Sequence, residues 1–163
     1  MTTPQRDIPQ EDGWRQTHLG RLLGHAMRRF DARVLQLMAR NVDVPLALSN
    51  LAARDQVSAA HIHITRHLSL QGDRLTELAE RAGMTKQAMA HLVDQCEAWG
   101  LVTRGPDPLD ARARRVCFTP DGLAWLRAFR EAVAQAEAEF RAAVGDDVAT
   151  VVAIGLEAYA EGG

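Results

Sequence analysis

The chain of 163 residues has little cysteine, no excess of positive charge and no long apolar run. Two cysteines, no stretch of bilayer-spanning length and no signal-peptide start together predict a cytoplasmic protein with no membrane contact. The net charge of -2 argues against a protein that coats nucleic acid indiscriminately, because such binding needs an excess of Lys and Arg. With 47% hydrophobic and 25% charged residues, we expect one compact globular domain.

The sequence also lacks the motifs of the common enzyme sites. It contains no Gly-rich phosphate loop, no Gly-x-Ser-x-Gly, no Cys-x-x-Cys and no His-Glu-x-x-His, and its acids and histidines form no set with the spacing that chemistry requires. We therefore predict that the protein is not an enzyme and that it holds no cofactor and no metal.

Charge is distributed unevenly along the chain. Residues 1–64 carry 8 basic and 6 acidic side chains, residues 65–119 carry 8 and 7, and residues 120–163 carry 3 and 8. The acidic C-terminal part is therefore where we would not place a nucleic acid.

Long amphipathic helices are predicted at both ends. Apolar residues recur at spacings of three and four over residues 18–40, and again after Thr119 and Pro120, which suit the cap and first position of a helix. That second stripe comprises Leu123, Leu126, Phe129, Val133, Phe140 and Val144. A last helix over residues 147–160 offers Val148, Val151, Val152, Leu156 and Tyr159 for burial. Such faces need a partner, so we predict a twofold homodimer.

The segments between these helices are shorter. Residues 1–13, with two prolines and mostly polar side chains, are expected to be a flexible arm, and residues 41–56 a loop with one short helix. Ser58 is the expected cap of a helix that runs to Leu68.

Two short helices joined by a glycine-containing turn follow. Thr76 is the predicted cap of the first helix, which ends before Gly83, and Thr85 is the predicted cap of the second, which ends at Gly100. The second helix places one apolar face inward, made of Met89, Leu92, Val93 and Cys96. This pattern is typical of a helix-turn-helix.

The sequence pattern changes after Gly100. Residues 101–104 and 115–119 are strand-like, and the turn-rich residues 105–108 lie between them. The sequence thus predicts a mainly α winged helix-turn-helix fold: about six helices and a small antiparallel β-hairpin, the wing.

Several short motifs follow one another over about 50 residues: Leu78-Ala79-Glu80-Arg81-Ala82-Gly83-Met84-Thr85-Lys86-Gln87-Ala88, Leu92-Val93-Asp94, Trp99-Gly100-Leu101-Val102, Asp107-Pro108-Leu109-Asp110-Ala111-Arg112 and Phe118-Thr119-Pro120-Asp121-Gly122. In composition and order these motifs resemble the core of the MarR family of transcriptional regulators. The resemblance implies a regulator that binds duplex DNA at a pseudo-palindromic operator, usually a repressor that a small aromatic effector releases.

The residues agree with that implication. If the second helix buries its apolar face, the opposite face of its first half can enter a major groove, where Gln87 suits adenine and Lys86 suits guanine or a phosphate. Thr85 and the helix N-terminus suit a backbone phosphate. The predicted DNA-binding residues of this helix are Thr85, Lys86, Gln87, Ala88 and His91. Relatives often have arginine at the position of His91, so the base it would read stays open.

In the wing, Arg112, Arg114 and Arg115 are predicted to cluster at the hairpin tip, where arginine can probe a minor groove. The resemblance makes Asp110 the partner that orients Arg112. Relatives commonly carry a second arginine where Ala111 stands here, so affinity is expected to depend more on Arg114 and Arg115.

The resemblance also implies a division of the chain and a ligand pocket. The effector would lie among the first, second and fifth helices, near His25, Arg29, His61 and Phe129. The division is residues 1–13 as arm, 14–56 as dimerisation helix and connector, 57–119 as DNA-binding region and 120–163 as C-terminal dimerisation helices.

Two alternative functions stay open. One is a winged-helix module that contacts proteins and has lost DNA binding, which the acidic balance would suit. The other is a sensor of the same fold that responds through the thiols of Cys96 or Cys117, or through a metal at His63 and His67, which lie one helical turn apart. The simpler expectation is that Cys96 is a small core residue and that the three tryptophans, Trp14, Trp99 and Trp125, are packing residues.

Overall fold

A computed structural model of the chain describes residues 13–45, 48 and 59–162. Within these residues it has seven α-helices and a three-stranded antiparallel sheet, which confirms the predicted mainly helical winged fold. Ser58, the arm over residues 1–12 and most of the segment 46–58 lie outside the described residues. The elements are α1 (Trp14–Thr17), α2 (Leu19–Met38), α4 (Ala59–His67), β1 (Asp73–Arg74), α5 (Leu75–Arg81), α6 (Lys86–Ala98), β2 (Val102–Asp107), β3 (Asp110–Phe118), α7 (Pro120–Val144) and α8 (Asp146–Glu161).

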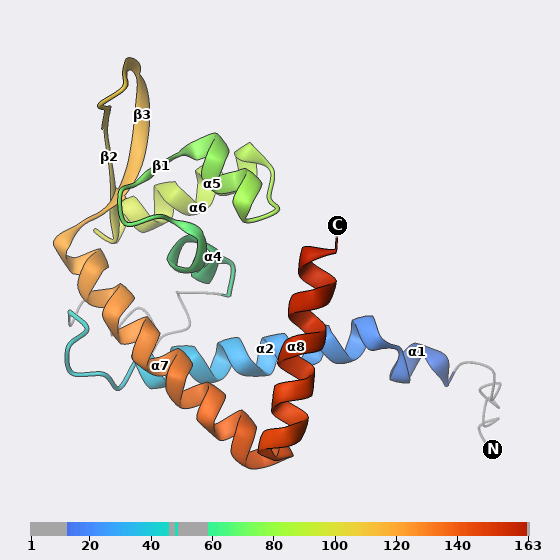
Figure 1. Cartoon of the computed structure of the whole chain (residues 1–163). Helices are drawn as coiled ribbons and strands as arrows, with labels where there is room; N and C mark the ends of the chain where they lie inside the picture. The colour runs from blue at the N-terminus through green and yellow to red at the C-terminus, as the bar shows by residue number, and fades with distance from the viewer. Residues whose placement is uncertain (1–12, 46–47, 49–58, 163) are drawn as a thin grey trace, which may run out of the picture.

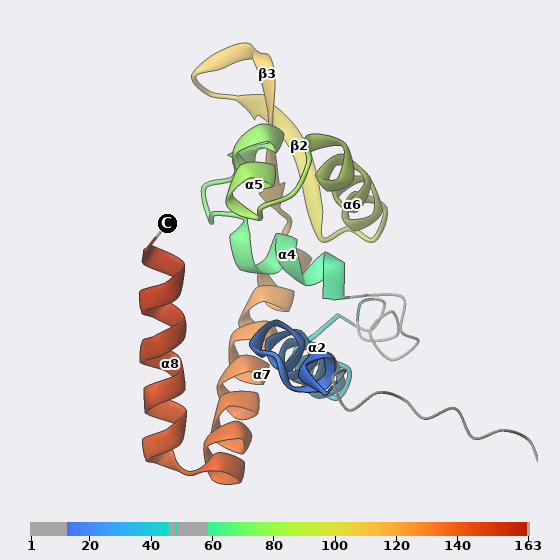
Figure 2. The same cartoon turned by 90° about the vertical axis from the view of Figure 1, so that its right-hand side faces the viewer.

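The elements form two layers, which we call the head and the platform. The head comprises α4, α5, α6 and the sheet, and the β2–β3 hairpin projects from its far end (Figure 1). The platform comprises α2, α7 and α8: α7 descends from the sheet across α2, and α8 returns beside α7 (Figures 1 and 2). The long helix α7 therefore connects the sheet of the head directly to the platform.

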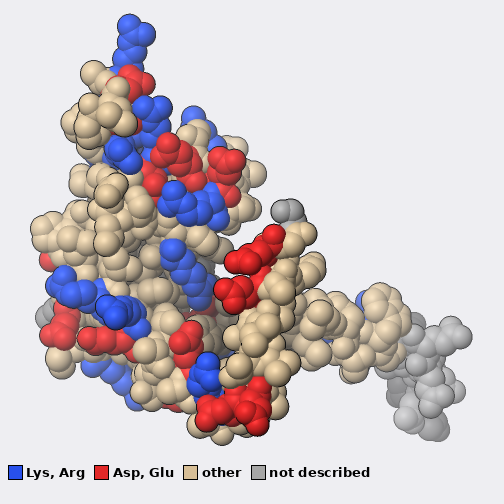
Figure 3. Space-filling view, in the orientation of Figure 1, with Lys and Arg blue, Asp and Glu red and all other residues tan. Residues whose placement is uncertain are grey.

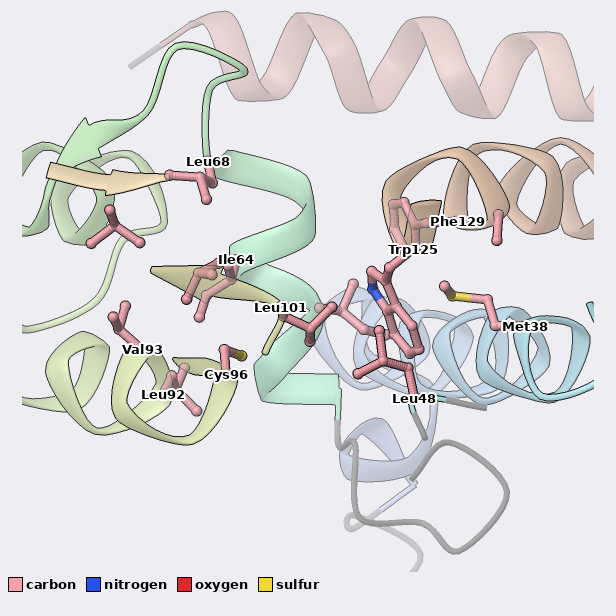
Figure 4. Packing of buried hydrophobic residues seen from close by; sticks show 14 of the residues in the cluster. Met38, Leu48, Ile64, Leu68, Leu92, Val93, Cys96, Leu101, Trp125 and Phe129 are labelled. Atoms are coloured by element: carbon pink, nitrogen blue, oxygen red, sulfur yellow. The ribbon is translucent and has the colours of Figure 1, made fainter. Parts of the chain in front are cut away.

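One apolar core joins the two layers. Trp125 of α7 is buried and its indole Nε1 donates a hydrogen bond to Oγ1 of Thr65 on α4, at 3.1 Å. The Arg66 guanidinium of α4 lies 2.5 Å from the buried carboxylate of Asp31 on α2. Around these contacts the side chains interdigitate (Figure 4), among them Met38, Leu48, Ile64, Leu92, Val93, Cys96, Leu101 and Phe129.

Threonine caps set two helix starts as the sequence predicts. Oγ1 of Thr85 accepts the backbone N–H of Ala88 at 3.2 Å, and Oγ1 of Thr119 accepts that of Gly122 at 3.0 Å. The prediction of Thr76 as a cap is wrong. Helix α5 begins at Leu75, because the Glu77 carboxylate accepts the N–H of the cap residue Arg74 at 2.9 Å.

The sheet is larger than predicted. Strand β1 pairs with β3 through Asp73 and Val116, so the order is β1-β3-β2. The wing strands run to Asp107 and from Asp110, so the turn occupies only these residues and the two between them. The strands therefore extend further toward the turn than the predicted residues 101–104 and 115–119.

Only part of each predicted apolar stripe is buried within a single chain. The interior face of α7 consists of Trp125, Ala128, Phe129, Ala132 and Ala136, while Leu123, Phe140 and Val144 are each more than a third exposed. Helix α8 buries only Ala149, and its exposed side chains include Val151 at 69%, Ile154 at 61% and Tyr159 at 83%. Trp14 is 65% exposed, so it does not pack in the core of the single chain. In the described part of the chain, no helix has both the length and the apolar character needed to cross a bilayer.

Candidate DNA interface

Helix α6 has one buried and one exposed face, as the helical period predicts. The buried face carries Met89, Leu92, Val93 and Cys96. The exposed face of its first half carries Lys86, Gln87, Ala88 and His91, preceded by the exposed cap Thr85. The structure thus brings these five predicted residues together on one surface, near a helix N-terminus whose free N–H groups favour anions.

Ion pairs connect the second half of α6 to strand β2 of the wing. The Arg104 guanidinium of β2 lies 2.5 Å from the Asp94 carboxylate and also pairs with Glu97. The Glu97 carboxylate accepts the N–H of Arg104 as well, at 3.1 Å. Burial lowers the pKa of Arg104, but the two carboxylates raise it by more. Arg104 therefore fixes the wing to α6, and its charge is balanced within the protein.

The arginines of the wing do not form the predicted cluster of three at the tip. Arg112 and Arg114 are exposed on β3, and Lys and Arg side chains gather at the wing end of the molecule (Figure 3). Arg115 faces the other way, because successive strand residues alternate between faces. Its guanidinium donates to the carbonyl of Gly72 at 2.6 Å, and its Nε is buried without a hydrogen-bond partner.

Asp110 lies beside the wing turn. Its carboxylate accepts the backbone N–H of Arg112 at 3.0 Å, so it orders the main chain of that arginine. The same carboxylate lies 3.6 Å from the guanidinium of Arg74, a residue that the sequence did not single out.

Arg74 also pairs with Asp107, the first residue of the wing turn. Its Nε donates to the Asp107 carboxylate at 2.6 Å, and that side chain is only 3% exposed. The hydrogen bond from the Leu109 N–H and the one from Arg74 lower the pKa of Asp107. Sequence reasoning missed this pair because the partners are 33 positions apart and no local pattern connects them.

The four residues predicted to line an effector pocket lie in different surroundings. His25 and Arg29 are exposed on α2, whereas Phe129 is buried on α7. His61 is buried against α6: its Nε2 lies 2.7 Å from Oε1 of Gln95, and its ring centroid lies 4.6 Å from that of Trp99. His61 therefore contacts α6, the helix whose first half carries the exposed polar surface described above.

The thiols and the histidine pair give little support to a sensor. Burial raises the pKa of Cys96 to about 12, so its reactive thiolate is scarce near neutral pH. Cys117 is half-buried on β3. The rings of His63 and His67 stack with centroids 5.8 Å apart, and the described residues contain no group of three or more His, Cys, Asp or Glu side chains arranged to hold a metal.

A helix-turn-helix with an exposed helix face and an arginine-bearing hairpin beside it defines the winged helix-turn-helix class. Residues 55–113 match the model of the MarR family. No curated protein matches the chain significantly.

Solved structures of MarR-type regulators share the fold. One is the transcriptional repressor CouR bound to a 23-mer DNA duplex, with a TM-score of 0.67 and 23% identity over 91% of this chain and 96% of that one. Another is CouR from Rhodococcus jostii RHA1 bound to p-coumaroyl-CoA, with a TM-score of 0.64 and 20% identity over 89% of this chain and 93% of that one. A third is PcaV from Streptomyces coelicolor in complex with its natural ligand, with a TM-score of 0.61 and 20% identity over 90% of this chain and 94% of that one. Residues 55–113 thus match the MarR family, and the chain as a whole shares the fold of these transcription regulators.

Proposed function

We propose that the protein is a homodimeric transcription regulator that binds a pseudo-palindromic duplex operator through α6 and the wing. The observation that carries the proposal is the joint exposure of Lys86, Gln87 and His91 on α6 and of Arg112 and Arg114 on β3. Helix α6 would enter the major groove with Gln87 and Lys86 at base edges, and the wing arginines would enter the adjacent minor groove. Arg115 would support the wing from within, since its guanidinium is directed at Gly72.

The homodimer is proposed from the exposed apolar surfaces of the platform. Large apolar side chains stand in solvent on α1, α2 and α8, and a monomer rarely leaves a patch of this kind uncovered. In Figure 3 the length of α8 is largely uncharged and its acidic side chains lie toward its ends. A second copy covers such a self-complementary face by twofold symmetry and would place the two α6 helices about 10 bp apart or a near multiple. We assign residues 57–119 to DNA binding, and residues 14–56 and 120–163 to dimerisation.

Control by a small aromatic effector is the finer part of the proposal. CouR and PcaV have been solved with bound ligands, which supports a ligand site in this fold. We place the site near His25, Arg29, His61 and Phe129. Since His61 contacts Gln95 and Trp99, a ligand that moves its ring would displace α6 relative to α4. Such a ligand acts only if it binds the DNA-competent and DNA-incompetent states with different affinity.

Selection of bound sequences from a random duplex pool tests the proposal. We expect an enriched pseudo-palindrome and an affinity whose logarithm falls linearly with the logarithm of the salt concentration. No enrichment, or salt-insensitive binding without sequence preference, would favour the protein-contact module that the acidic balance suits. Titration of the selected operator with aromatic acids and their CoA thioesters then tests effector release, and repression is tested with a reporter gene.

A further inference from the structure

We propose that Arg74 is a positioning residue that holds the wing at the angle needed to reach the minor groove. The inference rests on the proposed function, since it concerns how the DNA-facing surface is assembled. It is carried by the contacts of Arg74 with three separate elements, the start of α5, strand β3 and the wing turn.

The main chain of Arg74 is fixed from two sides. It forms the last pair of β1 with β3, opposite Arg115, and its N–H donates to the Glu77 carboxylate at 2.9 Å. The residue therefore has the same position relative to the helix-turn-helix whenever α5 is formed.

The side chain extends from that fixed point to both acids of the wing turn. Nε of Arg74 lies 2.6 Å from the Asp107 carboxylate, and Nη2 lies 3.6 Å from the Asp110 carboxylate. Each acid in turn accepts a main-chain N–H of the wing, from Leu109 at 2.9 Å and from Arg112 at 3.0 Å. One guanidinium thus links the helix-turn-helix to the two carboxylates that shape the wing tip.

The alternative role for Arg74 is a direct contact with DNA phosphate. The geometry argues against it, because the guanidinium already faces two carboxylates and Asp107 is almost completely buried. A buried carboxylate whose cation is withdrawn becomes costly, so the pair resists exchange of Arg74 for a phosphate partner.

The two roles predict opposite effects of the variant D107N on operator affinity. It removes a negative charge from the DNA-facing head, so electrostatics alone predicts tighter binding to the operator. The positioning role predicts weaker binding, because the wing turn loses its link to Arg74. E80Q removes an exposed negative charge of α5 without touching the turn and is the matched control.

We expect R74A and D107N each to weaken operator binding roughly tenfold. The double variant should bind the operator no more weakly than the single variant with the lower affinity, because the two residues act through one contact. R74K should recover part of the loss, and protection of the flanking minor grooves should fall while that of the major groove remains. Unchanged or tighter binding by D107N, or effects that add, would overturn the inference.

Amide hydrogen exchange of the DNA-free protein provides a readout that does not depend on operator binding. In R74A, the Leu109 and Arg112 amides should exchange roughly tenfold faster than in the wild type, while amides within α6 keep their rates. Equal rates at Leu109 and Arg112 in R74A, D107N and E80Q would refute positioning even if the protein bound no DNA. Failure of the wild type to select any duplex would instead refute the proposed function.

Discussion

Gly122 lies where α7 leaves the wing, and replacing it with alanine should destabilise the whole fold. An alanine Cβ would lie 1.9 Å from the Leu101 carbonyl oxygen and 3.1 Å from Cδ1 of Phe118. Since carbon and oxygen normally approach to about 3.3 Å, α7 would have to move by more than about 1 Å. That movement also breaks the hydrogen bond from the Thr119 N–H to the same carbonyl, now 3.1 Å long.

The expected loss in the free energy of unfolding follows from these contacts. Overpacking costs about 1–3 kcal/mol, and the lost hydrogen bond adds about 1 kcal/mol. The higher helix propensity of alanine offsets up to about 1 kcal/mol. The net loss of about 2 kcal/mol in the free energy of unfolding corresponds to a Tm lower by about 4–8 °C.

Thermal and urea unfolding at fixed protein concentration would measure the effect, because a dimer makes Tm depend on concentration. Gly105 of the same hairpin provides the control: no atom lies within 4 Å of the Cβ position there, so G105A should be neutral or slightly stabilising. A G122A protein as stable as the wild type would refute the assigned contact between α7 and the wing base.

Three further changes test other parts of the structure. The lowered pKa of Asp107 stabilises the fold fully above its ordinary value of 3.8, and this contribution is lost as the pH falls through the lowered pKa. The urea midpoint of D107N should therefore depend less on pH than that of the wild type below about pH 4; equal slopes there would contradict the pairing. Iodoacetamide at neutral pH should modify Cys117 well before Cys96, whose pKa is raised to about 12, as mass spectrometry would show; prior modification of Cys96 would contradict its burial. Charged residues on exposed α8, as in V151E with I154E, should convert the proposed dimer to monomers in sedimentation, and a dimer that persists would place the interface elsewhere.

The helix-turn-helix could be predicted from the sequence because its signals are local. Thr85 and Thr119 cap the helices that follow them, and Gly83 ends the helix before it with a φ of 64°. Strand β1 could not be predicted in this way, since a two-residue strand exists only through its pairing with β3.

Some side-chain directions in the site could be assigned only from the structure. The exposed face of α6 follows from the helical period, so Gln87 and His91 were predicted on one surface. The hydrogen bond of Arg115 to the Gly72 carbonyl could not be predicted, because it depends on the pairing of β1 with β3. The pairing of Arg74 with Asp107 depends on a tertiary approach that only the folded hairpin brings about.

The central claim is that the exposed surfaces of α6 and the wing bind duplex DNA together. It is tested most directly by measuring operator affinity for the wild type, K86A with Q87A, R112A, and the control R127A, an exposed arginine of α7 in the platform. We expect the first two variants to lose roughly tenfold or more while R127A binds like the wild type and all remain dimeric. Equal affinities across the set, or a loss confined to R127A, would contradict the account.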